Sequence, residues 1–157
     1  MKKILLCITA IFGACQLPAQ KPFKQNTVYF EMAGNGLVLS LNYERQITSK
    51  PGLGLHAGVG LADNKPSFPV GVKYLFDLGR ERSFLEVGAG VTFAEQDMWE
   101  TNYNQSKPDP YKAGFIPSVG YTYKAPKGFM VRINYTPVFN KYRTELLYFG
   151  LSIGWRI

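Results

Sequence analysis

From Asn26 onward, apolar and polar residues alternate with a period of two, and clusters of turn-forming residues interrupt the alternation repeatedly. This period is typical of β-strands that have one apolar and one polar face. Most segments approach the ~9–11 residues that a tilted strand needs to cross a bilayer. The pattern predicts eight strands, at residues 26–34, 37–45, 52–62, 67–78, 83–93, 113–123, 128–137 and 146–157.

The segments between the predicted strands carry residues that tight turns require, such as Lys50-Pro51-Gly52 and Pro126-Lys127-Gly128. The sequence Gly34-Asn35-Gly36 predicts a tight hairpin turn and not a phosphate-binding loop, because no strand-to-helix context surrounds it. If the first strand starts at the periplasm, the two longest connections, 94–112 and 138–145, lie outside the cell together with 34–36 and 62–66. Short periplasmic turns and longer outer loops are typical of outer-membrane barrels.

The two faces of the predicted strands differ in a way that indicates which face meets water. One face holds large apolar side chains with no charge or amide, and the other is rich in glycine with few charges of both signs. Glycine weakens a strand unless space is short, as it is inside a narrow eight-stranded barrel. The chain therefore predicts an all-β fold, an eight-stranded antiparallel up-and-down transmembrane β-barrel with its apolar face outward. A periplasmic barrel that binds a hydrophobic ligand, with the faces reversed, is the alternative.

The first twenty residues resemble a secretory signal peptide. Lys2 and Lys3 precede the apolar run 4–14, and 17–20 supplies a cleavage region, with cleavage after Ala19 or Gln20. This predicts a signal peptide at 1–20 and an outer-membrane barrel domain at 21–157. A second interpretation is a lipobox at 12–15, in which Cys15 would be lipidated.

The last predicted strand resembles the C-terminal assembly signal of outer-membrane barrels, through Gly150, Ile153 and Trp155, although Ile157 stands where phenylalanine is usual. With the export signal and eight strands, residues 26–157 resemble the small OmpA/OmpX-type barrels and related outer-membrane β-barrel domains. The resemblance implies an outer-membrane location, contact with outer-membrane lipid, and recognition by the barrel assembly machinery through these three residues.

The net charge of +7 includes Lys2 and Lys3, and the remaining 16 basic residues against 11 acidic ones leave +5. Because no run of lysine or arginine occurs, we expect no nucleic-acid partner. The basic excess suits anionic lipid head groups instead.

Seven charged residues fall on the inward face: Glu31, Glu44, Lys73, Asp77, Glu86, Arg132 and Arg156. Burying an unpaired charge costs several kcal/mol, so we predict an ion-pair network that plugs the barrel. Mid-strand depth selects the members Glu31, Lys73, Glu86 and Arg132. A gated ion path is the alternative, although eight strands leave little room for one.

The sequence gives little support for catalysis. His56 is the only histidine, and it is followed by Ala57-Gly58, so the H-x-S spacing of outer-membrane lipid A deacylases is absent. One histidine without cysteine or a carboxylate cluster does not form a metal site. We expect no enzyme activity, no metal and no cofactor, and an outer-membrane lipid-modifying enzyme stays as an alternative.

The predicted outer loop 94–112 carries exposed aromatic residues beside acidic ones. Trp99, Tyr103 and Tyr111 are candidates for binding an extracellular ligand, because aromatic residues among polar ones are typical of recognition surfaces. The predicted function is therefore a non-enzymatic, structural or surface-interacting role.

Overall fold

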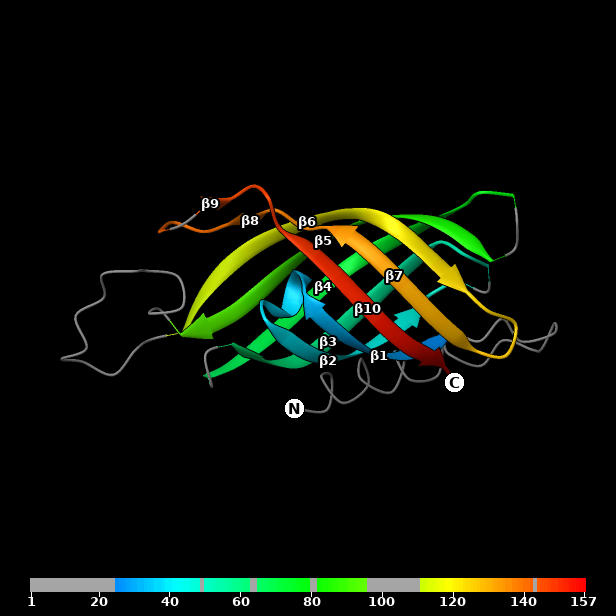
Figure 1. The fold of residues 1–157 in the computed structure, drawn as a ribbon, viewed down its shortest axis with the longest axis horizontal. Coiled ribbons are helices and arrows are strands. Elements are labelled where there is room, and N and C mark those ends of the chain that lie inside the picture. Colours follow the sequence, from blue (N-terminus) through cyan, green and yellow to red (C-terminus); the bar gives the residue numbers. More distant parts are fainter. Residues whose placement is uncertain (1–24, 49, 63–64, 80–81, 96–110, 143) are drawn as a thin grey trace, which may run out of the picture.

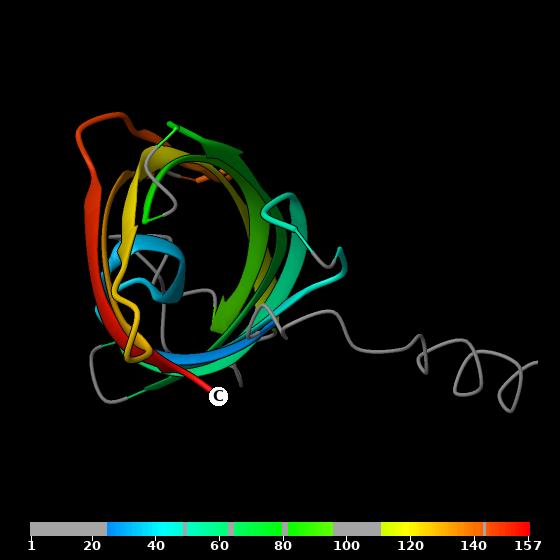
Figure 2. The same ribbon diagram turned by 90° about the vertical axis from the view of Figure 1, so that its right-hand side faces the viewer.

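The computed structural model describes residues 25–48, 50–62, 65–79, 82–95, 111–142 and 144–157. Eight long strands form a closed antiparallel barrel, shown from the side in Figure 1 and nearly end-on in Figure 2. They follow the order β5-β4-β3-β2-β1-β10-β7-β6, and β5 pairs with β6 to close the ring. The elements are β1 (Asn26–Ala33), η1 (Gly34–Gly36), β2 (Leu39–Gln46), β3 (Leu53–Ala62), β4 (Lys65–Asp77), β5 (Ser83–Glu95), β6 (Tyr111–Lys124), β7 (Phe129–Tyr135), β8 (Val138–Phe139), β9 (Thr144–Glu145) and β10 (Phe149–Arg156).

The predicted fold class is confirmed, but two strand boundaries differ from the prediction. The seventh long strand ends earlier than predicted, and the eighth begins later. β7 ends at Tyr135, two residues before Pro137, which has no N–H to donate to a ladder. After this break, β8 pairs with β6 through Phe139 and Phe115, and with β9 to form a short hairpin. β5 and β6 extend further than predicted and pair from Ser83 to Glu95.

The outer surface of the barrel is apolar and its interior is mostly polar. Along β4, for example, Val70, Val72 and Tyr74 are exposed while Lys73 between them is buried. The same alternation holds on the other long strands, whose exposed apolar side chains include Phe30, Leu41, Val59, Val87, Val119, Ile133 and Ile153. The outward orientation of the apolar face is thus the predicted one.

The interior also contains apolar side chains that the sequence pattern did not predict. Leu75, Phe84, Ile116 and Met130 are each almost completely buried on the inward face. Asp77, which was predicted to point inward, pairs with inward Phe84 at the end of β4. It is nevertheless exposed there, and its carboxylate accepts a hydrogen bond from the N–H of Gly79. Asp77 therefore lies on the predicted inward face, but it is exposed because it is the last residue of β4, at the open end of the barrel.

Glycine on the inward face allows the barrel to be narrow. A Cβ placed on Gly71 would lie 2.6 Å from the carbonyl oxygen of Ala89, and one on Gly88 would lie 2.9 Å from the carbonyl oxygen of Val72. Real side chains do not approach backbone so closely, so only glycine allows these strands their present separation.

The connection between β1 and β2 differs from the predicted hairpin turn. Its residues form the 3-10 element η1, and Gly34, Asn35 and Gly36 are all buried. Figure 2 shows η1, in light blue, inside the ring of strands. Residues 33–38 do connect two antiparallel strands, as the predicted hairpin does. The turn does not lie at the outer rim, however, because it folds into the space that neighbouring glycines leave open.

Candidate functional site: the charged lumen

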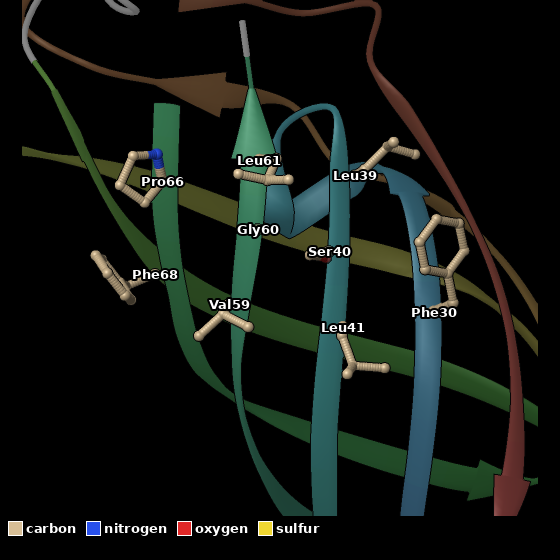
Figure 3. Close-up of a pocket in the computed structure, with 9 residues that line it drawn as sticks. All are labelled: Phe30, Leu39, Ser40, Leu41, Val59, Gly60, Leu61, Pro66 and Phe68. Carbon is tan, nitrogen blue, oxygen red and sulfur yellow. The ribbon is translucent and has the colours of Figure 1, made fainter. Parts of the chain in front are cut away.

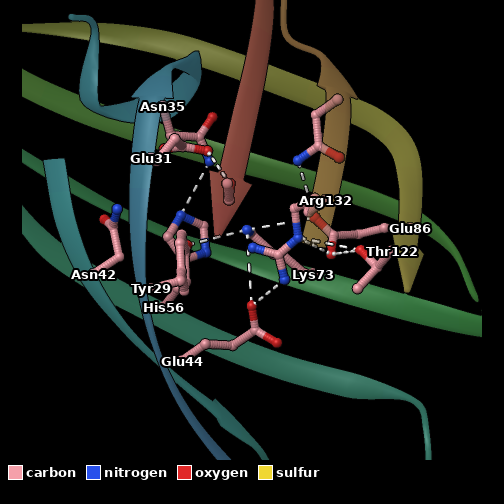
Figure 4. A network of polar contacts seen from close by, with 12 residues as sticks. Tyr29, Glu31, Asn35, Asn42, Glu44, His56, Lys73, Glu86, Thr122 and Arg132 are labelled. Atoms are coloured by element: carbon pink, nitrogen blue, oxygen red, sulfur yellow. Dashed lines mark hydrogen bonds and ion pairs between the residues drawn. The ribbon is translucent and has the colours of Figure 1, made fainter. Parts of the chain in front are cut away.

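A cluster of charged side chains lies across the lumen. Five strands contribute one residue each, and each residue occupies an inward position in its strand (Figure 4 shows four of them). All five side chains are buried: Glu44 on β2, Lys73 on β4, Glu86 on β5, Lys124 on β6 and Arg132 on β7.

Arg132 joins the two carboxylates. Its Nη2 lies 2.5 Å from Glu44 Oε2, and its Nε lies 2.7 Å from Glu86 Oε2. Lys73 Nζ lies between the same carboxylates, at 3.4 Å from Glu86 and 3.8 Å from Glu44. Lys124 Nζ is 3.9 Å from Glu44 Oε1. Each of these five charges therefore faces at least one opposite charge, as low-dielectric surroundings require.

Two neutral side chains also hydrogen-bond to Glu86 and Arg132. Thr122 Oγ1 donates a hydrogen bond to Glu86 Oε2 at 3.0 Å and accepts one from Arg132 Nε at 3.2 Å. Asn134 Nδ2 donates to Glu86 Oε1 at 3.3 Å. These bonds fix the orientation of the carboxylate relative to the guanidinium.

Tyr29 supplies both a hydroxyl and an aromatic face to the cations. Its hydroxyl accepts a hydrogen bond from Lys73 Nζ at 3.2 Å. Its ring centre lies 4.8 Å from the Arg132 guanidinium carbon and 5.0 Å from Lys73 Nζ, within the range of cation–π attraction.

Of the four residues predicted as a lumen network, Lys73, Glu86 and Arg132 lie together. Glu31 lies apart from them, and its carboxylate accepts hydrogen bonds from the Gly36 N–H at 3.4 Å and from Ser152 Oγ at 3.3 Å. Glu44, and not Glu31, is the second carboxylate that pairs with Lys73 and Arg132. The predicted inward face already included Glu44, but depth along the strand was a poor guide because the strands are tilted.

Lys124 is a member of the cluster that the sequence reasoning missed. The predicted strand ended at residue 123, one residue too early, whereas β6 ends at Lys124. The signal was available, since Lys124 is two residues after inward Thr122 and therefore lies on the same face. Arg156, which was also predicted to point inward, is half-buried at the barrel end and donates to the Ala125 carbonyl at 2.7 Å.

His56 points into the lumen from β3, but its contacts do not form a catalytic pair. Its Nε2 lies 3.1 Å from the Asn35 amide nitrogen, and its Nδ1 has no hydrogen-bond partner among the residues that the structure describes. Within the described residues, no group of three or more histidine, cysteine, aspartate or glutamate side chains could hold a metal ion. In the same part of the chain, no helix is long and apolar enough to cross a membrane.

The outer wall carries a shallow apolar depression across β1, β2, β3 and β4 (Figure 3). Phe30, Leu41, Val59 and Phe68 point outward around it. It is part of the apolar outer surface and does not connect the outside with the charged cluster.

The other predicted site residues are only partly within the described structure. Tyr111 begins β6, is exposed, and packs against Phe68 with 5.9 Å between ring centres. Trp99 and Tyr103 lie outside the described residues, as does the predicted signal peptide at 1–20 with Cys15.

The three residues of the predicted assembly signal lie on β10. Ile153 and Trp155 point outward, and Gly150 is buried. Recognition by an assembly machinery stays a prediction.

Comparison with known proteins supports the fold. The N-terminal β-barrel domain of Pseudomonas aeruginosa OprF superposes with a TM-score of 0.60, over 83% of this chain and 94% of that one, at 12% sequence identity. No protein-family model matches the chain, and no curated protein matches it significantly. The chain thus has the fold of a small closed antiparallel β-barrel, with an apolar outer surface and a charged interior.

Proposed function

We propose that this protein is an integral outer-membrane β-barrel with a non-enzymatic, structural or surface-interacting role, and that the charged cluster plugs its lumen. The observation that carries the proposal is the apolar surface on all eight long strands around a buried charged interior. Soluble monomers rarely expose contiguous apolar patches larger than a few hundred Å². A bilayer removes that surface from water, and a closed barrel leaves no unpaired strand edge in the hydrocarbon.

The position of aromatic side chains supports this location. Tyr43, Tyr74, Tyr121 and Trp155 are exposed toward the end of the barrel where the short turns lie. Aromatic girdles at the membrane interfaces are typical of outer-membrane barrels. The resemblance of the sequence to small outer-membrane barrels and the fold shared with the OprF domain support the same location.

The plug is proposed from the geometry of the charged cluster. Arg132 and Lys73 are held between two carboxylates from opposite parts of the ring, and all four side chains are buried. An open path would require these ion pairs to separate in a narrow interior. We therefore expect no steady conductance from wild-type protein in planar bilayers. A stable open channel of the wild type would contradict the plug.

A carrier of hydrophobic ligands is less well supported. Such a protein needs an apolar cavity, whereas the middle of this lumen is filled by charged and amide side chains. The apolar depression in Figure 3 lies on the outer wall, where the proposed location places lipid. The lipid-modifying enzyme is also less well supported, because the hydrogen-bond partner of His56 is the side-chain amide of Asn35 and not a serine hydroxyl.

The surface-interacting part of the proposal concerns the 94–112 loop. β5 and β6 pair as far as Glu95 and Tyr111, so the loop begins beyond a paired hairpin. We expect the triple variant Trp99→Ala/Tyr103→Ala/Tyr111→Ala to fold as the wild type does. Cells carrying it should bind less to extracellular proteins or polysaccharides, and equal binding would refute a role for these residues.

The first experiment tests location and orientation together. The full chain is expressed in a Gram-negative host, membranes are fractionated, and gel mobility is compared with and without boiling. We expect the wild type in the outer membrane with a heat-dependent shift, and Val72→Arg, on the outward face, depleted or degraded. A wild-type protein that is soluble without detergent and shows no shift would overturn the proposal.

A further inference from the structure

The inward turn η1 is held to the barrel wall by buried hydroxyl groups. Ser67 Oγ on β4 donates a hydrogen bond to the Gly36 carbonyl at 3.0 Å. Thr92 Oγ1 on β5 donates to the Asn35 carbonyl at 2.5 Å. Both hydroxyl-bearing residues are completely buried, so these bonds are shielded from competing water.

The other side of the turn is held as well. The Tyr148 hydroxyl donates to the carbonyl of Leu37, and Glu31 accepts from the Gly36 N–H at 3.4 Å. Leu37 and Tyr148 also pack against a small apolar cluster at this end of the lumen, formed by Ala94, Ile116 and Val138.

Three wall positions facing η1 are glycine, and each leaves room for it. A Cβ on Gly150 would lie 2.9 Å from Gly34 Cα, and one on Gly60 would lie 3.0 Å from the Gly36 carbonyl oxygen. A Cβ on Gly90 would lie 3.4 Å from the Asn35 amide nitrogen. The wall on β3, β5 and β10 is therefore shaped to receive this turn.

The backbone on both sides of η1 is strained. Ala33 has φ 58° and Leu37 has φ 72°, which are left-handed conformations that residues with a side chain rarely adopt. Strain favours release of the turn, while the hydroxyl bonds and the packing oppose it.

We propose that η1 is a latched lid over the outer half of the lumen, which moves outward when its hydroxyl bonds are lost and so exposes a polar vestibule. Glu31, His56, Ser67 and Thr92 would line that vestibule, since they now contact the lid. The charged cluster lies deeper and stays closed, so the lid controls access and not passage. Only the statement that the lid faces the cell exterior rests on the proposed function.

The test measures how fast a buried thiol reacts. Asn35→Cys is placed in a full chain that also carries Cys7→Ala and Cys15→Ser, and the folded protein in detergent is treated with a charged maleimide. Val38→Cys, next to the lid and exposed, serves as the accessible control. We expect Asn35→Cys to react about 100-fold more slowly than Val38→Cys, because it reacts only from the open position.

Removing the latches should speed this reaction. Adding Thr92→Val and Ser67→Ala should raise the Asn35→Cys rate at least about 10-fold, since two buried hydrogen bonds are lost. Thr92→Ser, which keeps the hydroxyl, should leave it slow, and Val38→Cys should react equally in all backgrounds. If the double variant does not fold, Tyr148→Phe tests the same point from the other side of the lid.

Two outcomes would overturn the lid. One is an Asn35→Cys rate equal to that of Val38→Cys with all latches present. The other is an unchanged slow rate in folded latch variants, judged folded by their heat-dependent gel shift. Because the reaction is run on purified folded protein, its result tests the lid independently of where the protein is located in the cell.

Discussion

Replacement of Glu86 by glutamine tests the lumen cluster most directly. Glu86 faces Arg132 at 2.7 Å and Lys73 at 3.4 Å, and both cations are fully buried. At an effective dielectric constant of about 20, these distances correspond to roughly 6 and 5 kcal/mol of attraction. Desolvation and repulsion from Glu44 offset much of this. We therefore expect the loss of about 3–5 kcal/mol that is typical when one partner of a buried ion pair is removed.

The assay is unfolding by guanidinium chloride of the protein folded in lipid vesicles, followed by tryptophan fluorescence. Glu95→Gln is the matched control, because Glu95 pairs with Lys65 at 3.0 Å but both side chains are partly exposed. That pair should contribute only about 0–1 kcal/mol. Adding Lys73→Met to Glu86→Gln removes one of the two buried cations that Glu86 balances, and it should recover part of the loss. Equal stabilities of Glu86→Gln and Glu95→Gln would refute the reasoning.

Three further variants test the outer surface, the narrow lumen and the neutral partners of the cluster. Val72→Arg, near the middle of β4, should destabilise the protein in vesicles by about 2–4 kcal/mol, and Leu53→Arg at a strand end by about 0–1 kcal/mol. If Val72→Arg and Leu53→Arg lowered the stability equally in the same unfolding assay, the middle of β4 would not lie at the bilayer midplane. Gly88→Ala should cost about 1–3 kcal/mol, because its Cβ would lie 2.6 Å from Ser118 Oγ and 2.9 Å from the Val72 carbonyl oxygen. If Gly88→Ala folded with the stability of the wild type, the lumen would be wider at this position than the structure shows. Thr122→Val should cost about 1–3 kcal/mol in the same assay, since it leaves a buried carboxylate and guanidinium one partner short; a neutral effect would show that water replaces the hydroxyl.

The sequence predicted the barrel well because the features that define it are local. The alternation around Val70, Val72 and Tyr74 depends only on neighbouring residues, and it gave the correct outward face. Errors arose where the alternation fades, at strand ends. There Asp77 is exposed although it is still paired, and Lys124 is buried although it lies beyond the predicted end of its strand. No local pattern marks the last paired residue.

The composition of the inward face was only partly predictable. Leu75, Phe84 and Met130 are apolar and occupy inward positions, so a rule that assigns apolar residues outward passes over them. They are buried because any side chain inside a closed barrel is shielded from solvent, whether it is polar or not. The predicted signal peptide at 1–20 lies outside the described residues and stays a prediction.

The sequence alone therefore determined the number of long strands, the face that each strand turns outward, and the presence of opposite charges in the interior. Only the tertiary structure decided which charges meet. Arg132 contacts Glu44, 88 residues earlier in the chain, because barrel closure and strand tilt set their relative height. The inward position of η1 was also decided there, since Gly60, Gly90 and Gly150 make room for it from three strands distant in sequence. Alternation is a property of each strand, whereas contacts across a lumen depend on how all eight strands close.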